Sequence, residues 1–96
     1  MGIELEQLRQ IAAIEEYGTL SAAAAALNIS QPALSRSMQR IEDDLCVRLF
    51  DRSKNHMEFN ANGRLLLTYA HRILDMENEM TRSVRDFDRS SRTITI

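Results

Sequence analysis

Residues 19–36 of this chain read TLSAAAAALNISQPALSR, and they carry the strongest signals of local structure in the sequence. Thr19 can cap a short Ala-rich helix over residues 20–27, whose small side chains allow another helix to approach closely. After a turn of three residues, Ser30 offers a second N-cap, and Pro32 then falls in the first helical turn, where its missing N–H costs nothing. The pattern predicts two helices joined by a tight turn.

The second of these helices is predicted over Gln31–Leu45. Its apolar residues Leu34, Met38, Ile41 and Leu45 fall within about 60° of one another at 100° per residue, which predicts a narrow stripe facing the core. Polar side chains crowd the opposite side near the amino end, whereas residues 42–44 at the other end are all acidic. A nucleic-acid backbone running along this helix would be repelled by the acidic end. We therefore expect contacts with nucleic acid to come from the first two turns of the helix.

The flanking sequence predicts further elements. Apolar residues at helical spacing before Gly18 predict a helix that ends near Tyr17. Two short alternating runs around the polar residues 53–56 predict a hairpin. Asn60 can cap a last helix that continues without Pro or Gly from Arg64 to about Arg89.

This last helix is about 45 Å long, too long to pack wholly on so small a domain. Apolar side chains recur along it in steps of seven residues, which is typical of helix pairing. We therefore predict a homodimer held by Leu66, Tyr69, Ile73, Met76, Met80 and Phe87. Residues 93–96 alternate like a strand that lacks a partner, which suggests the start of something longer.

The composition excludes several classes of protein. With 96 residues, three Gly and one Pro, the chain is predicted to be one mainly helical domain rather than a β-sandwich. No segment is apolar enough to span a membrane and no signal peptide is visible, so we expect a cytoplasmic protein. Cys46 is the single cysteine, and with His56 and His71 it makes no zinc site. No catalytic constellation can be assembled, so neither an enzyme, a metal nor a cofactor is predicted.

The net charge of −2 argues at first against nucleic acid. The acidic excess, however, lies entirely in residues 1–30, which carry one Arg against four Glu. Residues 31–59 are neutral and residues 60–96 carry one excess positive charge. DNA binding is therefore compatible with the charge if the acidic and basic parts face apart.

The run 19–36, above all Ser30–Ser35, resembles the helix-turn-helix of LysR-type transcriptional regulators, and the likeness continues through residues 45–52 to Gly63. It covers about residues 4–90 and implies a mainly α fold: a winged helix-turn-helix of three helices and a short β-hairpin wing, then a long linker helix that dimerises antiparallel. The implied domains are 1–59 for DNA binding, 60–90 for the linker helix, and 91–96 for the start of a separate effector-binding domain. Where the family usually has Gly, this chain has Cys46.

Two helices joined by a turn of three to four residues form the unit that enters a DNA major groove, when the second helix is capped and is polar at its exposed amino end. Arg36 can read guanine bidentately, and Gln31 or Gln39 can pair with adenine. Pro32 or Ala33 can touch a thymine methyl group. The predicted base-edge contacts are Gln31, Pro32, Ser35 and Arg36. The predicted phosphate or wing contacts, on the backbone or adjacent minor groove, are Thr19, Ser21, Ser30, Gln39, Arg52 and Lys54.

The predicted function is sequence-specific binding of double-stranded DNA by a bacterial transcription regulator. The alternative is a winged-helix interaction or oligomerisation module without DNA binding, which the acidic balance favours. A tetramer of the full-length protein and a contact with RNA polymerase are further candidates. Cys46, beside apolar neighbours, is predicted to be a small buried hydrophobe rather than a redox sensor. His71 and Asp75 share one helix face, and we interpret them as a solvated pair rather than half a metal site.

Overall fold

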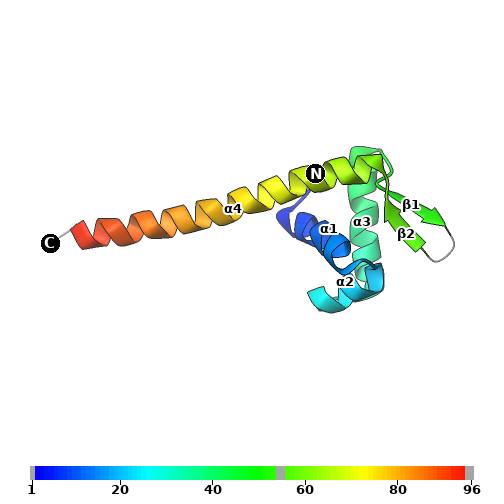
Figure 1. Cartoon of the computed structure of the whole chain (residues 1–96), viewed down its shortest axis with the longest axis horizontal. Coiled ribbons are helices and arrows are strands. Elements are labelled where there is room, and N and C mark those ends of the chain that lie inside the picture. Colours follow the sequence, from blue (N-terminus) through cyan, green and yellow to red (C-terminus); the bar gives the residue numbers. More distant parts are fainter. Residues whose placement is uncertain (1, 54–55, 95–96) are drawn as a thin grey trace.

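The computed structural model describes residues 2–53 and 56–94. A body of helices and a hairpin sits at one end of a long helix, and the rest of that helix extends away from it (Figure 1). In chain order the elements are α1 (Leu5–Tyr17), α2 (Leu20–Leu27), α3 (Gln31–Leu45), β1 (Phe50–Ser53), β2 (His56–Phe59) and α4 (Ala61–Ile94). The mainly helical winged helix-turn-helix predicted from the sequence is confirmed.

The borders of the first three helices lie where local capping places them. α1 ends at Gly18, which adopts a left-handed backbone conformation with φ of 85°. The Thr19 hydroxyl oxygen accepts a hydrogen bond from the Ala22 N–H at 3.0 Å, and the Ser30 hydroxyl oxygen accepts one from Ala33 N–H at 3.2 Å. Both predicted N-caps are therefore present.

The end of α3 differs from the expectation for Cys46. Cys46 is the left-handed C-cap of α3, with φ of 58°, so a non-glycine residue occupies the position where the resemblance implies Gly. Its side chain is exposed, and the thiol donates to the Asp43 carbonyl oxygen at 3.6 Å. The prediction of a buried Cys46 was wrong because the reversal of the chain at this cap takes place at the surface.

The core lies where α1, α2 and α3 meet, and the beginning of α4 closes it. From α3, Leu34, Met38 and Ile41 are fully buried, as the apolar stripe predicted. Leu45 is 40% exposed, because it lies in the last turn of the helix beside the exposed Cys46 cap. Among the residues whose burial the structure describes, the buried apolar side chains are Leu8, Ile11, Ala13, Ile14, Ala23, Ala24, Leu34, Met38, Ile41, Leu49, Phe50, Leu67 and Ala70.

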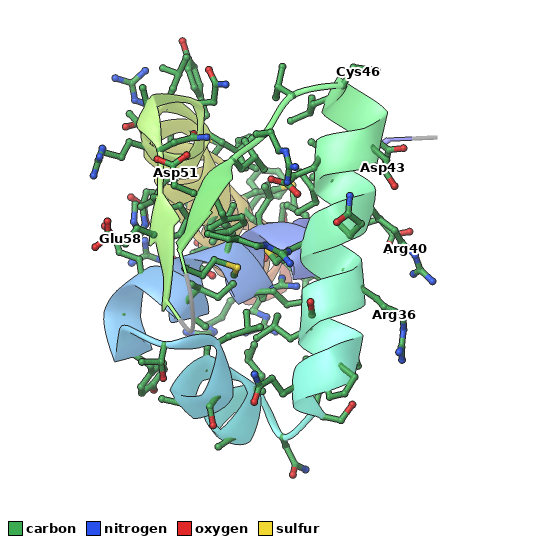
Figure 2. All side chains as sticks on the ribbon, turned by 90° about the vertical axis from the view of Figure 1, so that its right-hand side faces the viewer. Arg36, Arg40, Asp43, Cys46, Asp51 and Glu58 are labelled. Atoms are coloured by element: carbon green, nitrogen blue, oxygen red, sulfur yellow. The ribbon has the colours of Figure 1, made fainter. Side chains whose placement is uncertain are left out.

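The predicted wing is a two-stranded antiparallel hairpin. Phe50 is paired with Phe59, and their rings lie 4.9 Å apart at the base of the hairpin. Asp51 stands directly opposite Glu58, so two acidic residues form a cross-strand pair on the wing (Figure 2). The hairpin therefore packs through its aromatic base and carries charge further out.

α4 begins under the cap predicted for it and runs further than predicted. The Asn60 side-chain oxygen accepts from the Gly63 N–H at 2.9 Å. The helix continues through Ile94, so the prediction of a strand was wrong for Thr93 and Ile94, while residues 95–96 lie outside the described part. Continuing the helix gives the backbone N–H groups of these two residues hydrogen bonds that a strand without a partner would leave unmade.

Candidate nucleic-acid interface

The predicted base-edge residues lie on the exposed amino-terminal half of α3. Gln31, Pro32 and Arg36 are exposed, and Ser35 is half-buried. The Arg36 side chain points away from the body of the domain (Figure 2). The structure thus brings all four predicted residues to one accessible end of one helix.

The predicted phosphate contacts come from the start of α2, from the N-cap of α3 and from the middle of α3. Thr19 and Ser30 use their oxygens as acceptors in the caps of α2 and α3, and each hydroxyl keeps its proton to donate to a phosphate oxygen. Ser21 is exposed in the first turn of α2. Gln39 is exposed, and its side-chain amide donates to the Asp43 carboxylate at 3.1 Å, which holds the amide toward the carboxyl end of α3.

Arg40 is a candidate that the sequence analysis missed. It follows Arg36 by one turn, it is exposed, and both side chains extend from the same side of α3 (Figure 2). The sequence does show the spacing of four residues between the two arginines, which places them on the same face of a helix. Asp43 follows on the same side, so the positive surface ends after about two turns.

Glu42 has a role that the sequence analysis did not assign. In the sequence it belongs to the acidic end of α3, yet it is only 5% exposed, and its carboxylate accepts a hydrogen bond from the Leu49 N–H at 2.7 Å. The acidic surface at this end is therefore formed by Asp43 and Asp44, which are exposed. The inward position of Glu42 on the helix, next to the apolar stripe, was the available signal.

The wing presents both signs of charge. Arg52 is exposed on β1, one residue after Asp51. Lys54, predicted as the second basic contact of the wing, lies outside the described residues. Within the described part, Arg52 is the basic residue of the wing.

The predicted dimerisation residues of α4 separate into two groups. Tyr69, Ile73, Met76, Met80 and Phe87 are exposed, with Met76 at 62% and Phe87 at 75%. Leu66 is half-buried and packs against the core of its own domain. Leu65 and Val84 are exposed as well, and at 100° per residue all seven exposed side chains fall within about 100° of the helix circumference.

No other kind of site stands out in the described ranges. They hold no helix long and apolar enough to cross a membrane and no group of three or more side chains that could hold a metal ion. His71 is not part of a solvated pair with Asp75 as interpreted above, because its Nε2 lies 2.9 Å from Glu15 Oε1 on α1.

Fold and surface together define a winged helix-turn-helix DNA-binding domain with a long helix attached. The family model described as "Bacterial regulatory helix-turn-helix protein, lysR family" matches residues 5–64. The chain belongs to this family, and it is a helix-turn-helix DNA-binding domain of it. The family is one of transcription regulators, which confirms the prediction that the chain is not an enzyme.

Proteins similar in sequence to this chain are named as regulators or activators of transcription. It is 44% identical over 85 residues to the SDS degradation transcriptional activation protein of Pseudomonas sp. (strain ATCC 19151), which covers 88% of this chain and 28% of that protein. It is 34% identical over 94 residues to the HTH-type transcriptional regulator SoxR of Arthrobacter sp. (strain TE1826), covering 98% of this chain and 32% of that protein. The chain thus spans about a third of the length of these relatives or less.

Solved structures of similar domains contain DNA. The DNA-binding domain (DBD) of CbnR, solved in complex with DNA, superposes on this chain with a TM-score of 0.83 at 38% sequence identity. The match covers 88% of this chain and 98% of that one. The BenM DBD with the catB site 1 DNA gives a TM-score of 0.86 at 28% identity, covering 92% of this chain and 95% of that one. Full-length CbnR matches over 85% of this chain but only 28% of its own length.

Proposed function

We propose that the chain binds double-stranded DNA sequence-specifically, with the amino-terminal half of α3 in the major groove. The observation that carries this proposal is the gathering of Gln31, Pro32 and Arg36 on one exposed helix end in a fold matched by DNA complexes. Base-edge recognition needs side chains that hydrogen-bond or make apolar contact at the tip of a protruding helix, and these three residue types supply both. Ser35, half-buried beside them, adds a hydroxyl.

The charge distribution supports the same orientation. Arg36 and Arg40 follow one another on α3, whereas the acidic Asp43 and Asp44 lie at its carboxyl end. A phosphate backbone is attracted to the first half of the helix and repelled from the last turn. The hydroxyl groups of Thr19, Ser21 and Ser30 and the amide of Gln39 complete the contacts to phosphates, and Arg52 and Lys54 place the wing on the backbone or adjacent minor groove.

We further propose that two copies pair through α4, so that two α3 helices meet two half-sites. The exposed apolar stripe of α4 runs from Leu65 to Phe87, over which α4 rises about 33 Å. A contiguous apolar surface of this extent in water is unfavourable, and burying each large side chain contributes about 1.5–3 kcal/mol. A second copy offers the same stripe, as a twofold contact requires.

The relatives are about three times as long as this chain or longer. A bacterial regulator that binds DNA acts in the cytoplasm, where the chromosome lies. An effector-binding domain, a tetramer and a contact with RNA polymerase would belong to a full-length protein of the size of the relatives.

A salt titration on duplex DNA tests the DNA-binding proposal. We expect the affinity for duplexes selected by the chain from a random library to fall steeply as salt rises, because phosphate contacts release counterions. The duplex affinity of the variant Arg36→Ala is compared with that of Asp44→Asn. The second variant removes an acidic group from the other end of α3. The absence of duplex affinity at low salt would contradict the proposal and favour an interaction module.

A further inference from the structure

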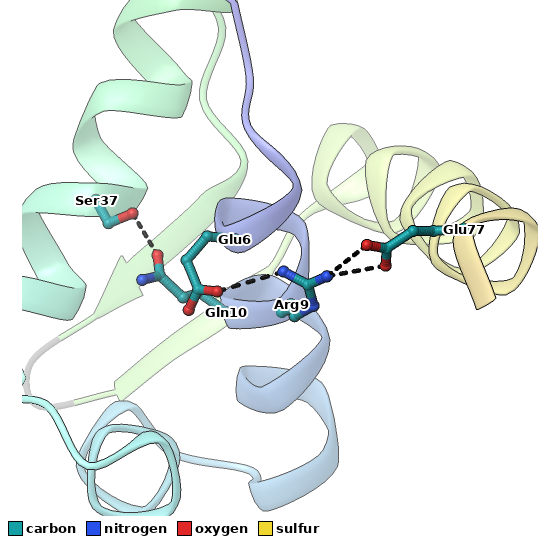
Figure 3. A network of polar contacts seen from close by, with 5 residues as sticks. All are labelled: Glu6, Arg9, Gln10, Ser37 and Glu77. Carbon is teal, nitrogen blue, oxygen red and sulfur yellow. Dashed lines mark hydrogen bonds and ion pairs between the residues drawn. The ribbon is translucent and has the colours of Figure 1, made fainter. Parts of the chain in front are cut away.

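α1 lies between α3 and α4 and is bonded to both through two neighbouring residues (Figure 3). On one side, the Ser37 hydroxyl of α3 donates to the side-chain oxygen of Gln10. On the other side, Arg9 Nη2 lies 2.8 Å from both carboxylate oxygens of Glu77 on α4. α1 therefore connects the helix proposed to read DNA with the helix proposed to hold the dimer.

Glu77 lies near the far end of the contact between α4 and the body. It follows Ala61, where α4 begins, by 16 residues, which is about 24 Å along the helix. Between them Leu67 and Ala70 are buried against the core. From residue 78 to residue 91 the side chains are exposed, except that of Thr81. A restraint at this distance from the start of the helix controls its tilt better than one close to it.

A second polar contact restrains the opposite flank of α4. His71 Nε2 lies 2.9 Å from Glu15 Oε1, and at 100° per residue His71 and Glu77 are about 120° apart on the helix. α1 thus holds α4 from both sides. Of the two contacts, the one to Glu77 lies further along α4 and has the less exposed partner, since the Glu77 side chain is 25% exposed.

We propose that the Arg9–Glu77 ion pair is a specificity determinant for the spacing between two half-sites. This inference rests on the proposed dimer. When two copies are joined through α4, the tilt of α4 against each body sets the separation of the two α3 helices. Successive base pairs are 3.4 Å apart, so a change in tilt that displaces α3 by this distance shifts it by one base pair. Arg9 and Glu77 act as positioning residues.

The pair acts on geometry more than on stability. Arg9 is 44% exposed, and ion pairs at the surface contribute little to the free energy of folding. Removing the pair leaves the buried contacts of Leu67 and Ala70 with the core intact. The body should therefore still fold and bind a single half-site. The range of angles that α4 adopts relative to the body should become wider.

The experiment measures the affinity for half-sites at different spacings. The probe is a duplex that the wild-type chain selects from a random library, remade with one or two base pairs added or removed between its half-sites. We expect the wild type to lose about tenfold or more in affinity per base pair of altered spacing, and Arg9→Ala and Glu77→Ala to lose less than about threefold. Their affinities for a duplex with a single half-site should equal that of the wild type.

Two further variants control for charge. Glu6→Gln removes the other carboxylate near Arg9, at 3.4 Å, and should keep the wild-type spacing profile. Arg9→Glu combined with Glu77→Arg restores an ion pair with reversed charges and should restore the spacing preference. If the alanine variants keep the wild-type profile, or lose affinity for the single half-site as well, the inference is overturned. A wild type that is monomeric and indifferent to spacing would overturn the proposed dimer together with it.

Discussion

The Glu42 carboxylate accepts a hydrogen bond of 2.7 Å from the backbone N–H of Leu49, and both residues are buried. The bond joins the last turns of α3 to the segment that enters the wing. The Leu49 carbonyl oxygen in turn accepts from the Asn60 N–H at 3.0 Å, just before α4. Leu49, which directly precedes β1, therefore connects α3, the wing and the start of α4 through its two backbone hydrogen bonds.

Glu42→Ala should destabilise the domain, because it leaves the buried Leu49 N–H without its acceptor. We expect a loss of about 1–3 kcal/mol in the free energy of unfolding, measured by urea denaturation. Glu42→Gln keeps a side-chain oxygen and should lose less. Asp44→Ala, at an exposed position two residues later, should change stability by no more than about 0.5 kcal/mol. Equal effects at positions 42 and 44 would contradict this account.

Gly63→Ala should also destabilise, because a Cβ there would lie 2.2 Å from the Leu49 carbonyl oxygen and 2.9 Å from the Phe59 ring. Backbone and ring would have to move, at a cost of about 1–3 kcal/mol in the free energy of unfolding. Gly2→Ala is the matched control, since a Cβ at Gly2 meets nothing within 4 Å. Thermal unfolding followed by circular dichroism compares the two, and an unchanged midpoint for Gly63→Ala would refute the close approach.

Cys46→Gly should stabilise the domain. Cys46 has φ of 58°, a conformation that costs a residue with a side chain on the order of 1 kcal/mol relative to Gly. We expect a gain of up to about 1 kcal/mol in urea denaturation, reduced by the greater freedom of Gly in the unfolded chain. Asn28→Gly, at φ of 59°, should gain less because Asn tolerates this conformation. A loss of stability for Cys46→Gly would show that the cap is not strained.

Arg36→Ala should lower the affinity for the preferred DNA site by about 1–3 kcal/mol and relax the sequence preference at one position. The measurement compares a set of duplexes that differ by single base pairs. Arg40→Ala, one turn further along α3, should weaken binding to all of these duplexes alike, as expected of a phosphate contact. A uniform loss for Arg36→Ala would assign Arg36 to the phosphates instead.

Ile73→Asp and Met80→Asp should convert the dimer to monomers, because each places a charge in the apolar stripe of α4. Sedimentation at micromolar concentration is the measurement. Asp75→Ala, on another face of the same helix, should leave the dimer intact. A monomeric wild type, or dimeric charged variants, would contradict pairing through this stripe. Monomers should bind DNA with an affinity near the nonspecific level.

The first three helices and the wing could be predicted from the sequence alone. Thr19 and Ser30 cap helices through backbone groups three residues away, and Gly18 ends one through its own backbone freedom. Such signals are local, so they can be read without the fold. The apolar stripes of α3 and α4 were equally visible, because helical periodicity depends on spacing along one element.

Which side chains have a partner from a distant part of the sequence becomes visible only when the helices are packed together. The burial of Glu42, the direction of Leu66 toward its own core and the ion pair between Arg9 and Glu77 each depend on an element packed from a distant part of the sequence. The exposure of Cys46 depends likewise on where the chain reverses. No spacing along one element encodes these relations, because burial and pairing are set by which surfaces meet when the helices pack.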